Sequence, residues 1–298
     1  MTYSIVARDP ETGQLGVGVQ TCFFAVGSIV PWARPGIGAV ATQAVAEAAY
    51  GPRCLDALGE GKDAAAALAT AQAADEMSAV RQVGVVGADG TAATLTGEMC
   101  IDHAGHVTGD GFSAQGNMLA TAEVWGAMAE AFEAATGPLP RRLLTALHAG
   151  EAAGGDGRGR MSAALLVVEA EPATQPAAGT LVDLRVDDHK APLDELSRLL
   201  DVADAFGGFT QAFEQLTAGD ADGALATVDS ALGILPDDEN LRFLRASALI
   251  SSGDVEVGGA ELRSLIANRP SWEPLIRSFA TGGYIPTPDG FDLDRALG

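Results

Sequence analysis

Lysine and aromatic residues are scarce in this chain of 298 residues. Lysine occurs only at Lys62 and Lys190, and the formal net charge is -22. A surface this acidic repels phosphate backbones and anionic lipid, so we expect neither nucleic acid nor a membrane as a partner. Aromatic residues make up 5% of the chain, whereas hydrophobic residues make up 47%. The core of this globular chain must therefore consist mainly of Ala, Val and Leu.

Cysteine is also rare, with Cys22, Cys54 and Cys100 far apart and no Cys-x-x-Cys pair. The odd number and the wide spacing argue against a disulfide framework and against a zinc ribbon. No window holds eighteen apolar residues in a row, and the amino terminus lacks a basic segment followed by an apolar run. We therefore expect a cytoplasmic protein.

Turn-forming residues divide the first part of the chain into blocks of strands and blocks of helices. The expected strands cover residues 2–8, 15–20, 38–43, 82–86, 92–96, 163–168 and 181–186, and the expected helices cover residues 52–59, 63–75, 121–135 and 141–150. This order is strands, two helices, strands, two helices, strands. It predicts an α+β fold in which two sheets lie between two helical layers, a four-layer αββα sandwich, better than it predicts an alternating β-α fold.

Residues 97–117 are polar and glycine-rich without a period, so we expect a long loop, and such loops are often functional. This segment holds the densest group of titratable side chains. Asp102 and His106 could act as a general-base pair. A metal bound by His103 and His106 is the weaker alternative because no third ligand is evident. We therefore predict no metal and no cofactor.

Two further polar segments could contact a substrate. Gln115 and Asn117 precede a helix and could offer amide donors to an oxyanion, or Asn117 could simply stand near a helix cap. Arg158 and Arg160, among glycines, could bind a carboxylate, although a solvated loop is the default. Without a Gly-Lys-Ser/Thr run this loop is not a Walker A phosphate-binding loop.

The chain beyond Pro192 is predicted to be helical and contains an internal repeat. Gly219-Asp220 recurs as Gly253-Asp254, and Pro236 recurs as Pro270, each 34 residues later. This period resembles the tetratricopeptide repeat. We expect one domain at residues 1–190 and a helical repeat region at residues 191–298. The repeats could form a groove for a protein partner or a degenerate cap on the main domain.

The first strand allows one specific chemical hypothesis. If Met1 is removed, Thr2 becomes the amino-terminal residue and carries both a hydroxyl nucleophile and its own amine base. The alternative is that a small residue merely follows the initiator methionine and begins an ordinary strand.

Many segments together resemble an Ntn-hydrolase-like family of unknown function. They are residues 2–13, 23–28, 30–33, 36–43, 50–52, 81–86, 96–97, 100–102, 105–106, 115–119, 154–156, 162–167 and 184–189. The resemblance spans roughly residues 1–200. It implies the αββα fold of N-terminal-nucleophile hydrolases, in which the first residue of the mature chain attacks an amide carbonyl, its free α-amine is the base and an oxyanion hole stabilises the intermediate.

The resemblance assigns the nucleophile to Thr2. Our own inference adds Asp102, His106 and Asn117 as supporting catalytic residues, with Gln115, Arg158, Arg160 and Ser162 as candidate substrate-binding residues. The chain also departs from the family pattern: His103 replaces a usual Trp, Met161 replaces an expected Gln, and the first sixty residues contain no lysine.

The sequence thus predicts a hydrolase acting on a small-molecule or peptide amide. The alternative is a non-catalytic scaffold that recruits a protein partner through its helical repeats. A smaller possibility is thiol chemistry at Cys22 or Cys100. Assembly into a homo-oligomer is left open.

Overall fold

The computed structural model describes residues 2–174, 176–284, 287–288 and 291–297. The chain divides into two compact units, Met1–Leu199 and Leu200–Gly298. The division falls within helix α5 (Pro192–Thr217).

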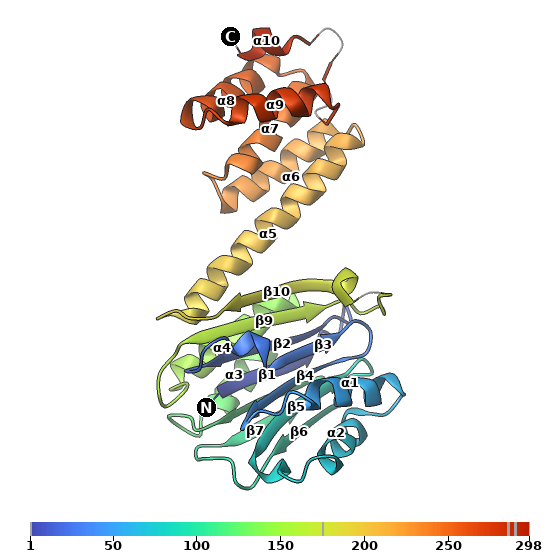
Figure 1. The fold of residues 1–298 in the computed structure, drawn as a ribbon, viewed down its shortest axis with the longest axis vertical. Coiled ribbons are helices and arrows are strands. Elements are labelled where there is room, and N and C mark those ends of the chain that lie inside the picture. The colour runs from blue at the N-terminus through green and yellow to red at the C-terminus, as the bar shows by residue number, and fades with distance from the viewer. Residues whose placement is uncertain (1, 175, 285–286, 289–290, 298) are drawn as a thin grey trace. The chain divides into compact units, whose positions relative to one another are not determined.

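Within the described residues, ten strands of the first unit form two antiparallel sheets (Figure 1). The strands are β1 (Thr2–Arg8), β2 (Leu15–Thr21), β3 (Pro31–Arg34), β4 (Gly38–Ala44), β5 (Arg81–Gly87), β6 (Ala92–Thr96), β7 (Gly105–Gly109), β8 (Phe112–Asn117), β9 (Ser162–Val168) and β10 (Thr180–Val186). The six-stranded sheet has the order β10-β9-β2-β1-β8-β7 and the four-stranded sheet the order β3-β4-β5-β6. Strand β1 therefore lies inside the larger sheet, between β2 and β8.

The inner faces of the two sheets pack against each other. Val6 and Val17 of the larger sheet share one buried cluster with Ala39, Ala41 and Val86 of the smaller sheet. Small side chains on β4 allow the two backbones to approach closely, as expected for a core with few aromatic residues. Since side chains alternate along a strand, the same face of β1 that carries Val6 also carries Thr2.

Helices cover the outer faces of both sheets. They are α1 (Tyr50–Gly59), α2 (Ala64–Ala73), α3 (Val124–Ala134) and α4 (Leu139–Ala152). Leu55 of α1 and Leu68 of α2 pack against the smaller sheet at Val83. On the larger sheet, a Cβ at Gly18 would lie 3.1 Å from Leu147 of α4, so glycine permits this close approach.

The predicted α+β class and the order of the strand and helix blocks are confirmed. The prediction of one long loop at residues 97–117 is wrong, because β7 and β8 occupy most of that segment. The polar side chains of β8, Ser113, Gln115 and Asn117, are buried between the sheets. They bond to other polar side chains there, so the usual polar signature of a loop is misleading.

The second unit consists of helices. After the carboxyl-terminal part of α5 come α6 (Ala221–Ile234), α7 (Glu239–Ser252), α8 (Val255–Asn268), α9 (Trp272–Thr281) and α10 (Leu293–Leu297). Gly219 and Gly253, with positive φ angles of 86° and 103°, end α5 and α7 in the left-handed conformation that favours glycine. Among the described residues, no helix combines the length and the apolar character needed to cross a bilayer.

Candidate active site

Thr2 stands at the beginning of β1 on the inner face of the larger sheet. It pairs in register with Asn117 of β8. Its hydroxyl donates to the hydroxyl of Thr21, at the end of β2, across 3.1 Å. Although only 7% of Thr2 is exposed, its side chain reaches a cavity.

The cavity beside Thr2 has a volume of about 300 Å³. Its walls are formed by Thr2, Thr21, Phe23, Val26, Ile29, Val30, Gln43, Ala44 and Ala46, which we call the Thr2 pocket. Six of these residues are apolar and none carries an ionisable side chain. In a chain of net charge -22, this is a locally uncharged site.

Buried amides connect the two sheets behind the Thr2 pocket. The Nε2 of Gln43 donates to the Thr2 carbonyl oxygen at 3.2 Å and to Oε1 of Gln82 at 2.8 Å. Asn117 Nδ2 donates to the same Gln82 oxygen at 2.9 Å. Gln82 in turn donates through Nε2 to the Gly116 carbonyl oxygen at 2.8 Å. This network fixes the backbone of Thr2 and the side chain of Asn117.

One atom of this network is unsatisfied. The Oε1 of Gln43 is buried and accepts no hydrogen bond from any residue that the structure describes, although Gln43 lines the Thr2 pocket. A buried acceptor without a donor costs about 1–3 kcal/mol. Unsatisfied polar groups of this kind often mark sites that a water or ligand completes.

Gln115, a predicted substrate-binding residue, lies deeper between the sheets and outside the pocket wall. Its Nε2 donates to Ser4 Oγ at 2.7 Å, and its Oε1 accepts from Ser113 Oγ at 2.7 Å. A Cβ at Gly84 on the facing sheet would lie 2.6 Å from the Gln115 oxygen. The bonds and the packing of Gln115 are therefore those of a sheet contact.

Asp102 and His106 do not pair with each other. Asp102 is exposed, while the Nδ1 of His106 lies 2.9 Å from Thr96 Oγ1 at the edge of the smaller sheet. Partial burial lowers the pKa of His106 below its ordinary value. Neither residue lines the Thr2 pocket. His103 is likewise exposed, and no group of three or more His, Cys, Asp or Glu side chains in the described parts of the chain is placed to hold a metal ion.

The two arginines predicted to bind substrate are engaged by carboxylates. Arg158 pairs with Asp156 at 3.2 Å, and the Asp156 carboxylate also accepts from the Cys22 backbone N–H at 2.8 Å. Arg160 lies 3.5 Å from Glu151, which accepts from the Tyr3 hydroxyl at 2.8 Å. These contacts join the loop after α4 to the larger sheet.

Ser162 contributes to the pocket indirectly. Its hydroxyl accepts from the Val26 backbone N–H at 3.1 Å and donates to the Phe23 carbonyl oxygen at 2.5 Å. Both partners belong to the segment that forms one wall of the Thr2 pocket. Ser162 is therefore placed to hold that wall in position.

Cys54 and Cys100 are not set up as activated thiols. Burial raises the pKa of Cys54 to about 12 and also raises the pKa of Cys100. The Sγ of Cys22 lies 3.6 Å from the Arg158 carbonyl oxygen. None of the three lines the Thr2 pocket.

Thr21, Gln43 and Gln82 were not among the site residues predicted from the sequence. A usable signal exists for the two glutamines, because each is the one amide in a strand of mostly small or apolar residues, GAVATQA for β4 and RQVGVVG for β5. An amide buried in such a strand requires hydrogen-bond partners. Thr21 has no comparable signal, since threonine is common in strands.

One family match covers almost the whole first unit. The model described as "Family of unknown function (DUF1028)" matches residues 2–196. The crystal structure of protein SPO2555 from Silicibacter pomeroyi, also assigned to DUF1028, is similar with a TM-score of 0.61 and 37% sequence identity. That similarity covers 68% of this chain and 85% of the other. No curated protein matches the chain.

Proposed function

Because this chain belongs to the family of unknown function DUF1028, whose description assigns no activity, we propose its function from the site: an amide-bond hydrolase of the Ntn type with Thr2 as the nucleophile. The observation that carries the proposal is the position of Thr2, whose hydroxyl is bonded to Thr21 in the wall of an uncharged pocket. Cleavage of the Met1–Thr2 bond would place an amine and a hydroxyl on one residue at that pocket.

The arrangement of the strands supports this proposal. Two antiparallel sheets pack face to face, α1 and α2 lie on one outer face, and α4 lies on the other. We interpret this order of layers as the αββα sandwich of Ntn hydrolases. In that fold the amino-terminal residue of a central strand is the nucleophile, and Thr2 begins a strand inside the larger sheet.

The reaction follows from the groups on Thr2. The Oγ1 proton passes to the Thr2 α-amine, directly or through one water, as Oγ1 bonds to the substrate carbonyl carbon. The C–N bond then breaks, the departing nitrogen takes the proton, and an ester remains on Thr2. A water molecule that loses its proton to the same amine hydrolyses the ester and restores the free hydroxyl.

Asn117 is the proposed oxyanion donor. It is the register partner of Thr2, and one of its two amide N–H groups is bonded to Gln82. An Asn side chain has two N–H donors, so the second can stabilise the negative oxygen that forms on the carbonyl carbon. Asn117 lies outside the pocket wall but pairs in register with Thr2. Asp102, His106, Arg158 and Arg160 lie outside the wall and lack this pairing, so they receive no role in the mechanism.

The test combines the intact mass of the protein with its hydrolytic activity toward amides. Intact-mass measurement on protein from its native host should show Thr2 as the first residue. A panel of chromogenic amides should then reveal hydrolysis that Thr2→Ala abolishes and Thr2→Ser largely retains, while Thr70→Ala, an exposed control on α2, has no effect. Retention of Met1, or equal activity in Thr2→Ala, would contradict the proposal.

A second candidate function belongs to the second unit. Helices α6 and α8 begin 34 residues apart and have equal length, which favours tetratricopeptide-like repeats. A small pocket on α5, α7 and α9 is lined largely by aromatic and apolar side chains: Phe209, Phe213, Leu216, Asn240, Phe243, Leu244, Ser247, Trp272, Phe279 and Tyr284. We propose that this face recruits a protein partner.

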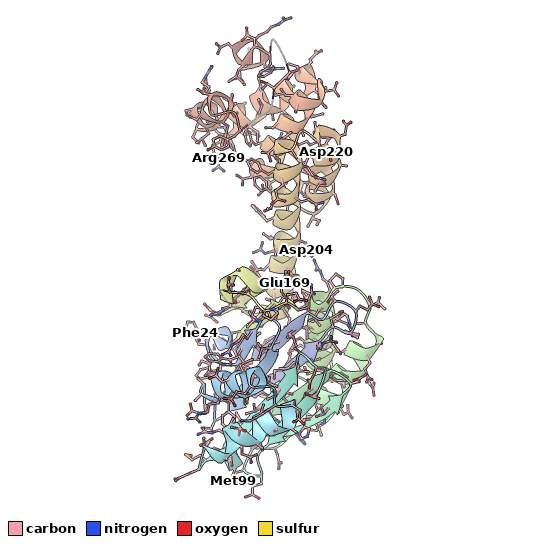
Figure 2. All side chains as sticks on the ribbon, turned by 90° about the vertical axis from the view of Figure 1, so that its right-hand side faces the viewer. Phe24, Met99, Glu169, Asp204, Asp220 and Arg269 are labelled. Carbon is pink, nitrogen blue, oxygen red and sulfur yellow. The ribbon has the colours of Figure 1, made fainter. Side chains whose placement is uncertain are left out.

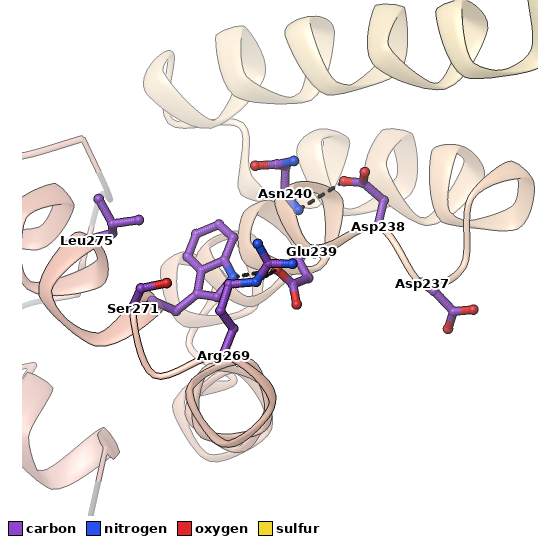
Figure 3. A pocket seen from close by; sticks show the side chains of 8 residues that line it. Asp237, Asp238, Glu239, Asn240, Arg269, Ser271 and Leu275 are labelled. Carbon is purple, nitrogen blue, oxygen red and sulfur yellow. Dashed lines mark hydrogen bonds and ion pairs between the residues drawn. The ribbon is translucent and has the colours of Figure 1, made fainter. Parts of the chain in front are cut away.

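A larger pocket of about 480 Å³ adjoins it, because Asn240 and Trp272 line both (Figure 3). Glu239 accepts from the Trp272 indole at 2.9 Å and pairs with Arg269 at 2.8 Å in this pocket. Leu275→Glu should therefore reduce the recovery of a protein cross-linked to the chain in its native host, whereas Val257→Glu, an exposed residue of α8 outside both pockets, should not. Equal recovery with both variants would count against recruitment.

A further inference from the structure

We propose that the Thr2 pocket binds the uncharged acyl part of a carboxamide, with room for roughly ten non-hydrogen atoms, and this inference rests on the proposed function. Three observations carry it: the composition of the pocket wall, the volume of the pocket and the rigid support of the wall.

The wall excludes charge. Phe23, Val26, Ile29 and Val30 supply apolar surface, and none of the nine lining residues has an ionisable side chain. Transfer of an ionised carboxylate or ammonium from water into such a site is strongly unfavourable without a counter-charge. An acyl group that carries an ionised group should therefore bind poorly, although Asp156, Arg158 and Arg160 carry charges on the loop at residues 156–160.

The volume limits the size of the acyl group. A cavity of about 300 Å³ corresponds to roughly ten atoms at the share of about 30 Å³ that one water occupies in the liquid. This is the lower end of the range of ligand pockets, about 300–1,000 Å³. A linear chain of six carbons or a phenylacetyl group fits this size, and a long fatty acyl chain does not.

The pocket wall is held in place before any ligand binds. Ser162 bonds to both Val26 and Phe23, and the Ala25 backbone N–H donates to the Asp187 carbonyl oxygen at 3.0 Å. Phe23 itself is 58% exposed at the wall, next to Phe24, whose side chain projects from the surface of the first unit (Figure 2). A supported wall favours selection by shape, because little ordering remains to oppose binding.

Binding of matched probes to the full-length chain tests this inference without requiring turnover. The probes are hexanamide and hexanoate, and their dissociation constants are measured by ligand-observed NMR on the wild type and on Thr2→Ala. We expect hexanamide to bind at least tenfold more tightly than hexanoate to both proteins. Equal binding of the two probes, or no binding of hexanamide, would overturn the inference.

A pair of variants locates the site. Ala46→Phe fills the pocket from an exposed position in its wall and should weaken hexanamide at least tenfold while leaving acetamide nearly unchanged. Ala48→Phe, an exposed neighbour outside the wall, is the matched control and should bind hexanamide like the wild type. If Ala48→Phe weakens binding as much as Ala46→Phe, the acyl site lies elsewhere.

The outcomes separate the two proposals. Selective hexanamide binding together with no Thr2-dependent hydrolysis would retain the acyl pocket and reject the catalytic function. Thr2-dependent hydrolysis with a preference for charged acyl groups would retain the catalytic function and reject the acyl pocket.

Discussion

The hydroxyl of Thr2 donates to the hydroxyl of Thr21 across 3.1 Å, and this bond joins the first residue of β1 to the last residue of β2. The hairpin that connects the two strands brings the residues together at the rim of the inner sheet face. This hydrogen bond, which the Thr2 hydroxyl donates, can orient Oγ1 toward a carbonyl carbon in the pocket.

Removal of the Thr21 hydroxyl should therefore impair the chemical step. Thr21→Val keeps the shape of the side chain and should lower kcat about 10- to 100-fold with little change in KM, because the nucleophile loses its orientation. Thr21→Ser should restore most of the activity. Steady-state kinetics on a chromogenic amide measures the effect, and an unchanged kcat in Thr21→Val would remove Thr21 from the site.

Asn117 should contribute transition-state stabilisation. Asn117→Asp preserves size but replaces a donor by a carboxylate that repels an oxyanion, so kcat should fall about 100- to 1,000-fold. Asn268→Asp, at an exposed position in the second unit, is the matched control. Circular dichroism must show that the fold of the variant is intact, since Asn117 also bonds to Gln82. A decrease in kcat of less than threefold would contradict the assignment.

Ser162 should act on substrate binding through the pocket wall. Ser162→Ala leaves the Val26 N–H without its acceptor, which should lower the free energy of unfolding by about 1–3 kcal/mol. The displaced wall should act mainly on KM: the factor by which KM rises should be about ten times the factor by which kcat falls. Kinetics and urea unfolding together check this, with Ser252→Ala at the end of α7 as the control. A variant that loses stability but keeps its KM would limit Ser162 to a structural role.

Asp75 makes the stability of the first unit depend on pH. The pKa of Asp75 is lowered from 3.8 to about 2, mainly by hydrogen bonds from Arg81, which outweigh the opposing effect of burial. Hydrogen bonds from the Met77 N–H and the Tyr50 hydroxyl lower it further. The folded state thus binds a proton less readily than the unfolded state. The stabilisation is complete above about pH 4 and is lost as the pH falls toward 2.

Asp75→Asn should consequently lower the free energy of unfolding by about 2 kcal/mol at pH 7, as expected when hydrogen bonds to a charged group are lost. The difference from wild type should shrink as the pH falls from about 4 to about 2. Asp56→Asn, which removes an exposed ion pair with Arg34, should change stability by less than about 1 kcal/mol. An equal loss for Asp75→Asn at both pH values would show that its carboxylate charge is not responsible.

The separation of the two sheets can be tested at Gly84. A Cβ there would lie 2.6 Å from Gln115 Oε1, so Gly84→Ala should destabilise the protein by about 1–3 kcal/mol. Gly207→Ala is the opposite case, because its Cβ would meet nothing within 4 Å in α5. It should stabilise the helix by up to about 1 kcal/mol. Thermal unfolding of both variants measures this, and a neutral Gly84→Ala would mean that the sheets can separate without cost.

Local sequence pattern by itself determined the α+β class and the order of the strand and helix blocks. The choice of Thr2 as a candidate nucleophile came from the resemblance to a family. The expected strands at residues 2–8 and 15–20 and the turn-forming residues between them are short-range signals, and both strands are present in the folded chain. The 34-residue spacing of α6 and α8 could likewise be found from residue positions alone.

Only the tertiary structure decided which polar residues accompany Thr2. Asp102 and His106 were chosen from the sequence because their segment holds the densest group of titratable side chains. The pocket is instead completed by Thr21 and Gln43 from separate strands. Strand β8 was mistaken for a loop because its side chains are polar. Polar side chains indicate an exposed segment only when the protein interior offers them no hydrogen-bond partners. Asn117 and its polar neighbours in β8 find such partners on strands far away in sequence, and that pairing is a property of the packed sheets.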